Sequence, residues 1–377
     1  MTARTEERVI PLELFFDLVF VFALTQVTAL MSHDTTWERL GQGMLVLAAL
    51  WWAWGAYAWL TNEIDADADL PRLAMFVSMT AMLIVALAVP NAFGDDAVIF
   101  ACAYFLVRVM HIVLFAEATP DLGVHEAAVR LARTAIPAPA LLIAAGFLDG
   151  PVQAALWIVA LAVDYSGPLV FGVSGFRVSA SHFAERFSLI VIIALGESIV
   201  AIGVGAADLE LDVGLIVAAV LGIVVACSLW WAYFDWMAIH AERLFRETVG
   251  DERTRIARDA YSYLHLPMVA GIVLVALAVK KTLGDVDEPL KTVPTVALLG
   301  GIALYLAGHV AFRLRLHSGL GRGRLTAAVV LLALIPVARE LDALAALAIA
   351  AAVSAALIAY EVIRFSDARA RVRAGAG

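Results

Sequence analysis

The chain has 377 residues, of which 63% are hydrophobic and 16% charged, and its mean hydropathy is +0.89. Soluble domains carry about 25% charged residues, so this composition excludes an ordinary soluble protein. The net charge of −9 decides little, because in a membrane protein the placement of Arg and Lys matters more than the sum of charges.

Apolar runs of about 20 residues recur along the whole chain, which predicts an all-α, polytopic membrane protein. The first run has no clear cleavage site after it, so we expect a retained span rather than a signal peptide. The eleventh run is the weakest, because Pro336 and Arg339 shorten it. The twelve expected spans are residues 11–31, 40–61, 71–90, 97–117, 129–147, 152–172, 183–205, 213–238, 258–280, 293–314, 324–338 and 342–364.

The positions of Arg and Lys predict the orientation of these spans. If the N-terminus is cytoplasmic, 20 of the 26 basic residues fall on the cytoplasmic side, five fall on the opposite side, and Arg108 lies within a span. Cytoplasmic loops of membrane proteins carry an excess of Arg and Lys. Both termini are therefore predicted to be cytoplasmic.

Several segments of the first half recur in the second half in the same order. LFFDLVFVFALTQVT at 14–28 aligns with ERFSLIVIIALGESI at 185–199, and LWWAW at 50–54 aligns with LWWAY at 229–233. Two six-span halves share one orientation, so the expected repeat is parallel. We expect one six-helix half at 1–175 and the other at 176–377, with the substrate path near their interface.

The first span opens with two carboxylates one helical turn apart, in ELFFDLVFVFALTQ. Glu13 follows Pro11 closely and suits either the first turn of a helix or a functional position. Asp17 lies about 6 Å deeper along the helix axis. Because an aspartate exposed to lipid costs about 2.5–3.5 kcal/mol, Asp17 should face the helix bundle, in an ion pair or on an ion path.

A third acid, Glu197, lies deeper in the membrane. It stands about 18 Å along the helix axis from Glu185, which begins the same span. Gly196 beside it permits close helix approach. Glu197 aligns with the uncharged Gln26 of the first half. It is expected either to exchange protons or to hold two helices together as a neutral group.

Arg108 and His111 lie one turn apart in FLVRVMHIVLF, within the fourth expected span. The arginine suits a counter-ion role toward Asp17 or Glu197, and the sequence does not choose between them. The alternative is that its side chain snorkels to the cytoplasmic interface.

His309 occupies the place of His111 in the second half, and both histidines suit hydrogen bonds within a bundle. Asp164 and Asp235 also fall in or near expected spans, with Asp235 following the pair Trp230-Trp231. The chain has neither His-Glu-x-x-His nor Cys-x-x-Cys spacing, so we expect no metal and no other cofactor. The cluster GLGRGR at 319–324 lacks the Walker lysine, and no nucleic acid partner is expected.

Three motifs carry a resemblance to a known family. PLELFFDLVFVFALTQ, ERFSLIVIIALGESIV and LWWAYFDW resemble the bacterial low-temperature-requirement A (LtrA) family of integral membrane proteins, over essentially the full chain. The resemblance implies a multi-pass protein of the bacterial inner membrane. It implies no reaction, because the family name records a growth phenotype.

Intramembrane ionisable residues mark ion and proton pathways by default. The first hypothesis is therefore a transporter or channel for an ion or small solute, linked to protons. Asp17, Arg108, His111 and Glu197 would line the path, supported by Glu13, Gln26, Glu185, Asp235 and His309.

Two other function classes stay open. One is an intramembrane enzyme acting on a lipid or lipid-linked substrate, with the acids as general acid and base. The absence of a recognisable nucleophile motif makes an enzyme less favoured. The other is a non-catalytic sensor or scaffold linked to growth at low temperature. The expected partners are the lipid bilayer and an unidentified solute or ion, and the sequence leaves the oligomeric state open.

Overall fold

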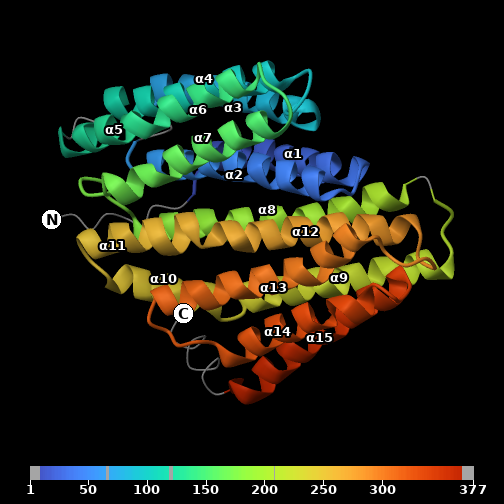
Figure 1. The fold of residues 1–377 in the computed structure, drawn as a ribbon. Coiled ribbons are helices and arrows are strands. Elements are labelled where there is room, and N and C mark those ends of the chain that lie inside the picture. Colours follow the sequence, from blue (N-terminus) through green and yellow to red (C-terminus); the bar gives the residue numbers. More distant parts are fainter. Residues whose placement is uncertain (1–8, 65–67, 119–121, 208, 367–377) are drawn as a thin grey trace. The chain divides into compact units, whose positions relative to one another are not determined.

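A computed structural model describes residues 9–64, 68–118, 122–207 and 209–366 (Figure 1). Within these ranges every regular element is a helix, apart from one isolated bridge between Pro289 and Asp342. The all-α prediction is therefore confirmed. The helices are α1 (Pro11–His33), α2 (Trp37–Leu60), α3 (Asp69–Ala88), η1 (Val89–Asn91), α4 (Ala97–Ala118), α5 (Leu122–Ala135), α6 (Pro137–Ala145), α7 (Gly150–Val170), α8 (Ala180–Ala206), α9 (Val213–Phe234), α10 (Met237–Glu247), α11 (Asp251–Ile256), η2 (Ala257–Tyr263), α12 (His265–Gly284), α13 (Thr292–Arg315), α14 (Arg322–Ala338) and α15 (Ala343–Arg364).

Eleven helical runs of the described residues are long and apolar enough to cross a membrane. The expected span that is not among them is the eleventh, at 324–338, which corresponds to α14, a helix of only 17 residues. At 1.5 Å per residue it is about 26 Å long, a little short of a hydrocarbon core of about 30 Å. Pro336 lies near its end, as the sequence analysis anticipated.

Two expected spans differ in their local structure. The fifth, expected as one run at 129–147, is broken into α5 and α6, with Pro137 opening the second helix. Proline lacks a backbone N–H, so the helical hydrogen bonding is interrupted at this point, while Ile136 keeps a helical backbone with φ −97° and ψ −48°. The ninth begins earlier than expected and contains a π-helical segment, η2, before α12.

The chain divides into two compact units. The first comprises Met1–Leu30, Gly41–Arg186 and Thr248–Arg258, and the second comprises Met31–Leu40, Phe187–Glu247 and Asp259–Gly377. In the first unit, α3 packs on α4, α4 on α5 and α6, and α6 on α7. In the second, α12 packs on α13, α13 on α14, α14 on α15, and α15 on α9.

Helices α12 and α13 of the second unit run side by side at short range (Figure 1). A Cβ atom added to Gly301 would lie 2.9 Å from the Gly271 carbonyl oxygen and 2.9 Å from the Cβ of Leu274. A Cβ added to Gly308 would lie 2.8 Å from the Met268 side chain. Small residues at these positions allow the two backbones to approach closely, as is common between membrane helices.

Candidate functional site

The first unit contains a buried polar cluster at the start of α1 and α8, which we call the α1–α8 cluster. It consists of Glu13, Asp17, Trp54, His182 and Arg186. Residues four apart on a helix share one face. The two acids are four apart on α1, and the two basic residues are four apart on α8. Each helix therefore presents a matched pair to the other.

Asp17 is the most fully satisfied member of the α1–α8 cluster. Arg186 Nη1 donates to Asp17 Oδ2 at 3.0 Å, and Nη2 lies 3.0 Å from Oδ1. The indole Nε1 of Trp54, on α2, donates to Oδ1 at 2.9 Å. The guanidinium also lies over the Trp54 ring, with 5.7 Å between its carbon and the ring centroid. Asp17 thus faces the bundle in an ion pair, one of the two roles expected for it.

Glu13 contacts both basic residues of the cluster. His182 Nε2 lies 2.9 Å from Glu13 Oε2, and Arg186 Nε lies 3.8 Å from Oε1. The backbone N–H of Ile10 donates to Oε2 at 3.0 Å, which is the first-turn role expected of an acid at this position. Glu13 therefore has the first-turn role expected of it, and its functional role stays a prediction.

The second ring nitrogen of His182, Nδ1, is hydrogen-bonded to a side-chain amide. Asn62 Nδ2 lies 2.9 Å from His182 Nδ1, and the Ser179 backbone N–H donates to Asn62 Oδ1 at 2.8 Å. The amide therefore fixes the ring orientation, while the second nitrogen faces Glu13. An imidazole and a carboxylate at 2.9 Å share one hydrogen bond, whose proton sits on either group.

The charges of the α1–α8 cluster do not balance without a proton. It holds two carboxylates and one guanidinium, and Glu13, Asp17 and Arg186 are each no more than 1% exposed. A buried net charge is costly unless it is compensated. A proton on His182 or on Glu13 brings the sum to zero. The arrangement is therefore suited to holding one proton away from water.

Arg108 lies in a separate ion pair of the first unit. Its Nη2 donates to Asp164 Oδ1 on α7 at 2.7 Å, and both side chains are buried. The sequence predicted Asp17 or Glu197 as the counter-ion of Arg108. Both predictions are wrong, because the counter-ion is Asp164. Helix adjacency decides the partner, and the sequence did not show which helix lies beside α4. Because the Arg108 side chain is only 3% exposed and pairs with Asp164 of α7, the snorkelling alternative is wrong as well.

His111 is buried one turn from Arg108. Its ring lies 5.7 Å from the ring of Tyr57 and 5.0 Å from that of Phe115, measured between centroids. The Tyr57 hydroxyl lies 2.7 Å from Ser78 Oγ and 3.0 Å from the Val107 carbonyl oxygen. His111 thus packs among aromatic rings, and a role on an ion path stays a prediction.

The remaining acids on α8 differ sharply in exposure. Glu197 is 1% exposed, as expected from its depth in the span. Glu185 is exposed, and one of its carboxylate oxygens accepts the Val9 backbone N–H at 3.1 Å. Gln26, on α1, is half-buried. Only Glu197 of these three has the burial of an intramembrane titratable group.

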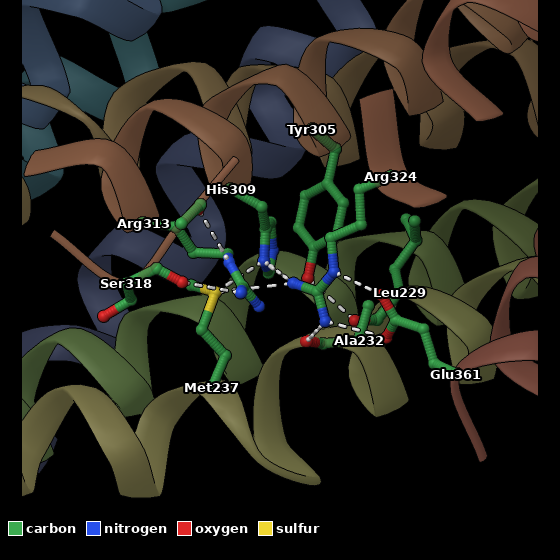
Figure 2. A network of polar contacts seen from close by, with 10 residues as sticks. Leu229, Ala232, Met237, Tyr305, His309, Arg313, Ser318, Arg324 and Glu361 are labelled. Atoms are coloured by element: carbon green, nitrogen blue, oxygen red, sulfur yellow. Dashed lines mark hydrogen bonds and ion pairs between the residues drawn. The ribbon is translucent and has the colours of Figure 1, made fainter. Parts of the chain in front are cut away.

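A second network occupies the second unit (Figure 2). Arg324 is paired with Glu361 by two contacts, Nε to Oε1 at 2.8 Å and Nη2 to Oε2 at 3.0 Å. It also donates to His309 Nδ1 at 2.6 Å and to the Ala232 carbonyl oxygen at 2.9 Å. Thus His309 does form hydrogen bonds within its bundle. Asp235 lines a cavity beside this network.

Family comparison supports the resemblance. Residues 8–359 match the model of the family described as bacterial low temperature requirement A protein (LtrA). The chain belongs to the LtrA family. A relative, named only as an uncharacterized protein of Rhizobium meliloti (strain 1021), is 32% identical over 308 residues, which cover 78% of this chain and 75% of the relative. No solved structure matches the chain.

The sequence of this LtrA-family protein did not single out three members of the α1–α8 cluster, Trp54, His182 and Arg186. Nor did it single out Asn62, which holds His182. One signal was available, since the spacing of His182 and Arg186 repeats the spacing of Glu13 and Asp17 at an offset of 169 residues. Within the described residues, no group of three or more His, Cys, Asp or Glu is arranged to hold a metal ion.

Proposed function

We propose that this LtrA-family protein is a proton-linked transporter or channel for an ion or small solute in the bacterial inner membrane. The α1–α8 cluster is its proton-binding element. One observation carries the proposal, namely two fully buried carboxylates facing a single guanidinium and a histidine. A purely structural pairing needs only one acid for each cation, whereas this set is neutral only when it holds a proton.

Proton occupancy changes how tightly the start of α1 is held to the start of α8. With the proton present, His182 and Glu13 attract each other across 2.9 Å and Arg186 is free to neutralise Asp17. Without it, Arg186 faces two carboxylates, the nearer oxygen of Glu13 being 3.8 Å from its Nε. Loss of the proton therefore weakens one contact between the two helices, which couples protonation to helix position.

The proposal includes an internal duplication with parallel halves. One feature of the structure supports it. Consecutive spans pack on one another in the same order within each unit, from α3 to α7 and from α12 to α15.

The proposal is tested by proton movement in liposomes. The purified protein is reconstituted around a pH-sensitive dye, and a potassium diffusion potential or a gradient of a candidate solute drives flux. Candidate solutes come from a thermal-shift screen. We expect Glu13→Gln and His182→Asn to lower proton flux at least about tenfold, a barrier change of about 1.4 kcal/mol.

Glu185→Gln is the matched control, because it removes an exposed carboxylate from α8. It should leave proton flux unchanged. A wild-type protein that moves neither protons nor any screened solute would contradict transport. It would favour an intramembrane enzyme, if a lipid substrate is turned over, or a sensor. Normal flux with an unchanged pH profile in Glu13→Gln would assign the cluster a structural role only.

A further inference from the structure

The second unit contains a cavity of about 280 Å³ that the proposed proton site does not use. It lies where the last residues of α9, α13 and α15 meet the first residues of α10 and α14. Its walls are partly aromatic, from Trp231, Trp236 and Phe365, and partly polar. Two of the candidate membrane spans, α13 and α15, end beside it, as is expected of a site at the level where a span meets water. Aromatic residues are enriched at that level.

Two guanidinium groups face this cavity and point toward one another (Figure 2). Arg324 is neutralised by its two contacts with Glu361. Arg313 is not neutralised in this way. It donates to the carbonyl oxygens of Ser318 at 2.8 Å and Gly319 at 3.4 Å. Among the described residues no carboxylate forms an ion pair with it. The Arg313 guanidinium therefore faces the cavity without a carboxylate of the described residues in direct contact with it.

Other polar groups stand beside Arg313. His240 Nε2 lies 3.2 Å from Ser318 Oγ, and both residues line the cavity. The guanidinium of Arg313 stacks on Trp236, 5.0 Å from the ring centroid. The guanidinium and the imidazole carry N–H groups suited to a phosphate oxygen, while the Ser318 hydroxyl donates to the Leu316 carbonyl oxygen at 3.3 Å. The carboxylates of Asp235 and Glu361 also line the wall, so a singly charged anion fits better than a multiply charged one.

We propose that this cavity binds the head group of an anionic phospholipid. The phosphodiester would lie against Arg313, Ser318 and His240, and the acyl chains would pass along Trp231 and Phe365 toward the bilayer. Trp231 is 40% exposed and Phe365 is 46% exposed, so both offer apolar surface at the cavity mouth. The inference does not depend on proton transport, and it assigns the second unit a lipid-binding site.

Three probes separate the parts of this ligand in titrations of the detergent-solubilised full chain. Short-chain phosphatidylglycerol has both an anion and acyl chains, glycerophosphate has the anion alone, and the matching diacylglycerol has the chains alone. We expect saturable binding of phosphatidylglycerol, with the other two at least about tenfold weaker. Equal binding of glycerophosphate would overturn the lipid assignment. Equal binding of diacylglycerol would overturn the role of the anion.

Variants of one position test the charge itself. Arg313→Gln should weaken phosphatidylglycerol binding about tenfold or more, the loss expected for one charge-assisted hydrogen bond. Arg313→Lys keeps the charge and should stay within about threefold of wild type, because electrostatic attraction persists. Arg322→Gln removes an equal charge from an exposed position outside the cavity and should bind normally. If Arg322→Gln weakened phosphatidylglycerol binding as much as Arg313→Gln does, the assignment of the binding site to this cavity would be wrong.

Discussion

Two of the buried ion pairs join residues that are far apart in sequence. Arg108 and Asp164 are 56 residues apart, and Asp17 and Arg186 are 169 apart. Composition and depth were enough to single out Asp17 and Arg108, because a charge in a membrane span needs compensation. The partners could not be chosen, since one sequence does not show which helices are neighbours. His182 was missed because a histidine near a loop carries no depth signal.

The Arg108–Asp164 pair gives a prediction for stability. Asp164→Asn leaves Arg108 buried without a compensating charge and should lower the free energy of unfolding by about 3–5 kcal/mol. Replacing both residues, as Arg108→Met with Asp164→Leu, should recover most of that loss, because no charge is then buried. Denaturation in mixed micelles measures both. A double variant less stable than Asp164→Asn would contradict a simple pair and indicate a wider network.

Glu197 gives a prediction for function. It is 1% exposed and aligns with the uncharged Gln26. If Glu197 exchanges protons, Glu197→Gln should fold normally but lose the pH dependence of flux in liposomes. If the role is structural, the same variant should function normally, while Glu197→Ala should destabilise by about 1–3 kcal/mol through a lost hydrogen bond. Glu185→Gln is again the control, since it changes an acid of the same helix that is exposed.

At the scale of elements, apolar runs predicted nearly all of the helices but not their interruptions. The break before Pro137 and the π-helical segment Ala257–Tyr263 both fall within spans expected to be continuous. The proline signal was present in the sequence and was outweighed by the apolar run around it. A π-helix depends on local hydrogen bonding, such as the Leu264 N–H donating to the Asp259 carbonyl oxygen, and hydropathy does not report it.

Two adjacent glycines of α13 test the close contact with α12. Gly301→Ala should destabilise the protein, because its Cβ would lie 2.9 Å from the Gly271 carbonyl oxygen. Gly300→Ala meets nothing closer than 3.6 Å and should stabilise by up to about 1 kcal/mol, the helix preference of Ala over Gly. Thermal unfolding in detergent compares the two directly. A Gly301→Ala protein as stable as Gly300→Ala would show that the helices separate at no cost.

At the scale of the whole molecule, the contacts of the α1–α8 cluster fix the relative direction of two helix starts. Glu13 contacts His182, and Asp17, one turn later, contacts Arg186. Both helices therefore run the same way at this point. Each crossing of a membrane reverses the direction of the chain, so two spans run the same way only if the chain crosses an even number of times from the start of one to the start of the other. From the start of α1 to the start of α8 the chain makes six crossings, α1 to α7 with α5 and α6 counted as one.

Parity and the distribution of basic residues together predict the topology. Loops after an odd number of spans should lie outside the cytoplasm, so reporters fused at Asp95 and Leu148 should report the periplasm. Reporters at Gly250 and Gly319, which follow eight and ten expected spans, should report the cytoplasm, in keeping with the arginine-rich segments beside them. Paired phosphatase and fluorescent-protein fusions read both sides. Reversed signals at two of the four sites would overturn the orientation. An inside signal at Leu148 alone would mean that α5 and α6 do not cross as one span, and the parallel start of α1 and α8 would then need another explanation.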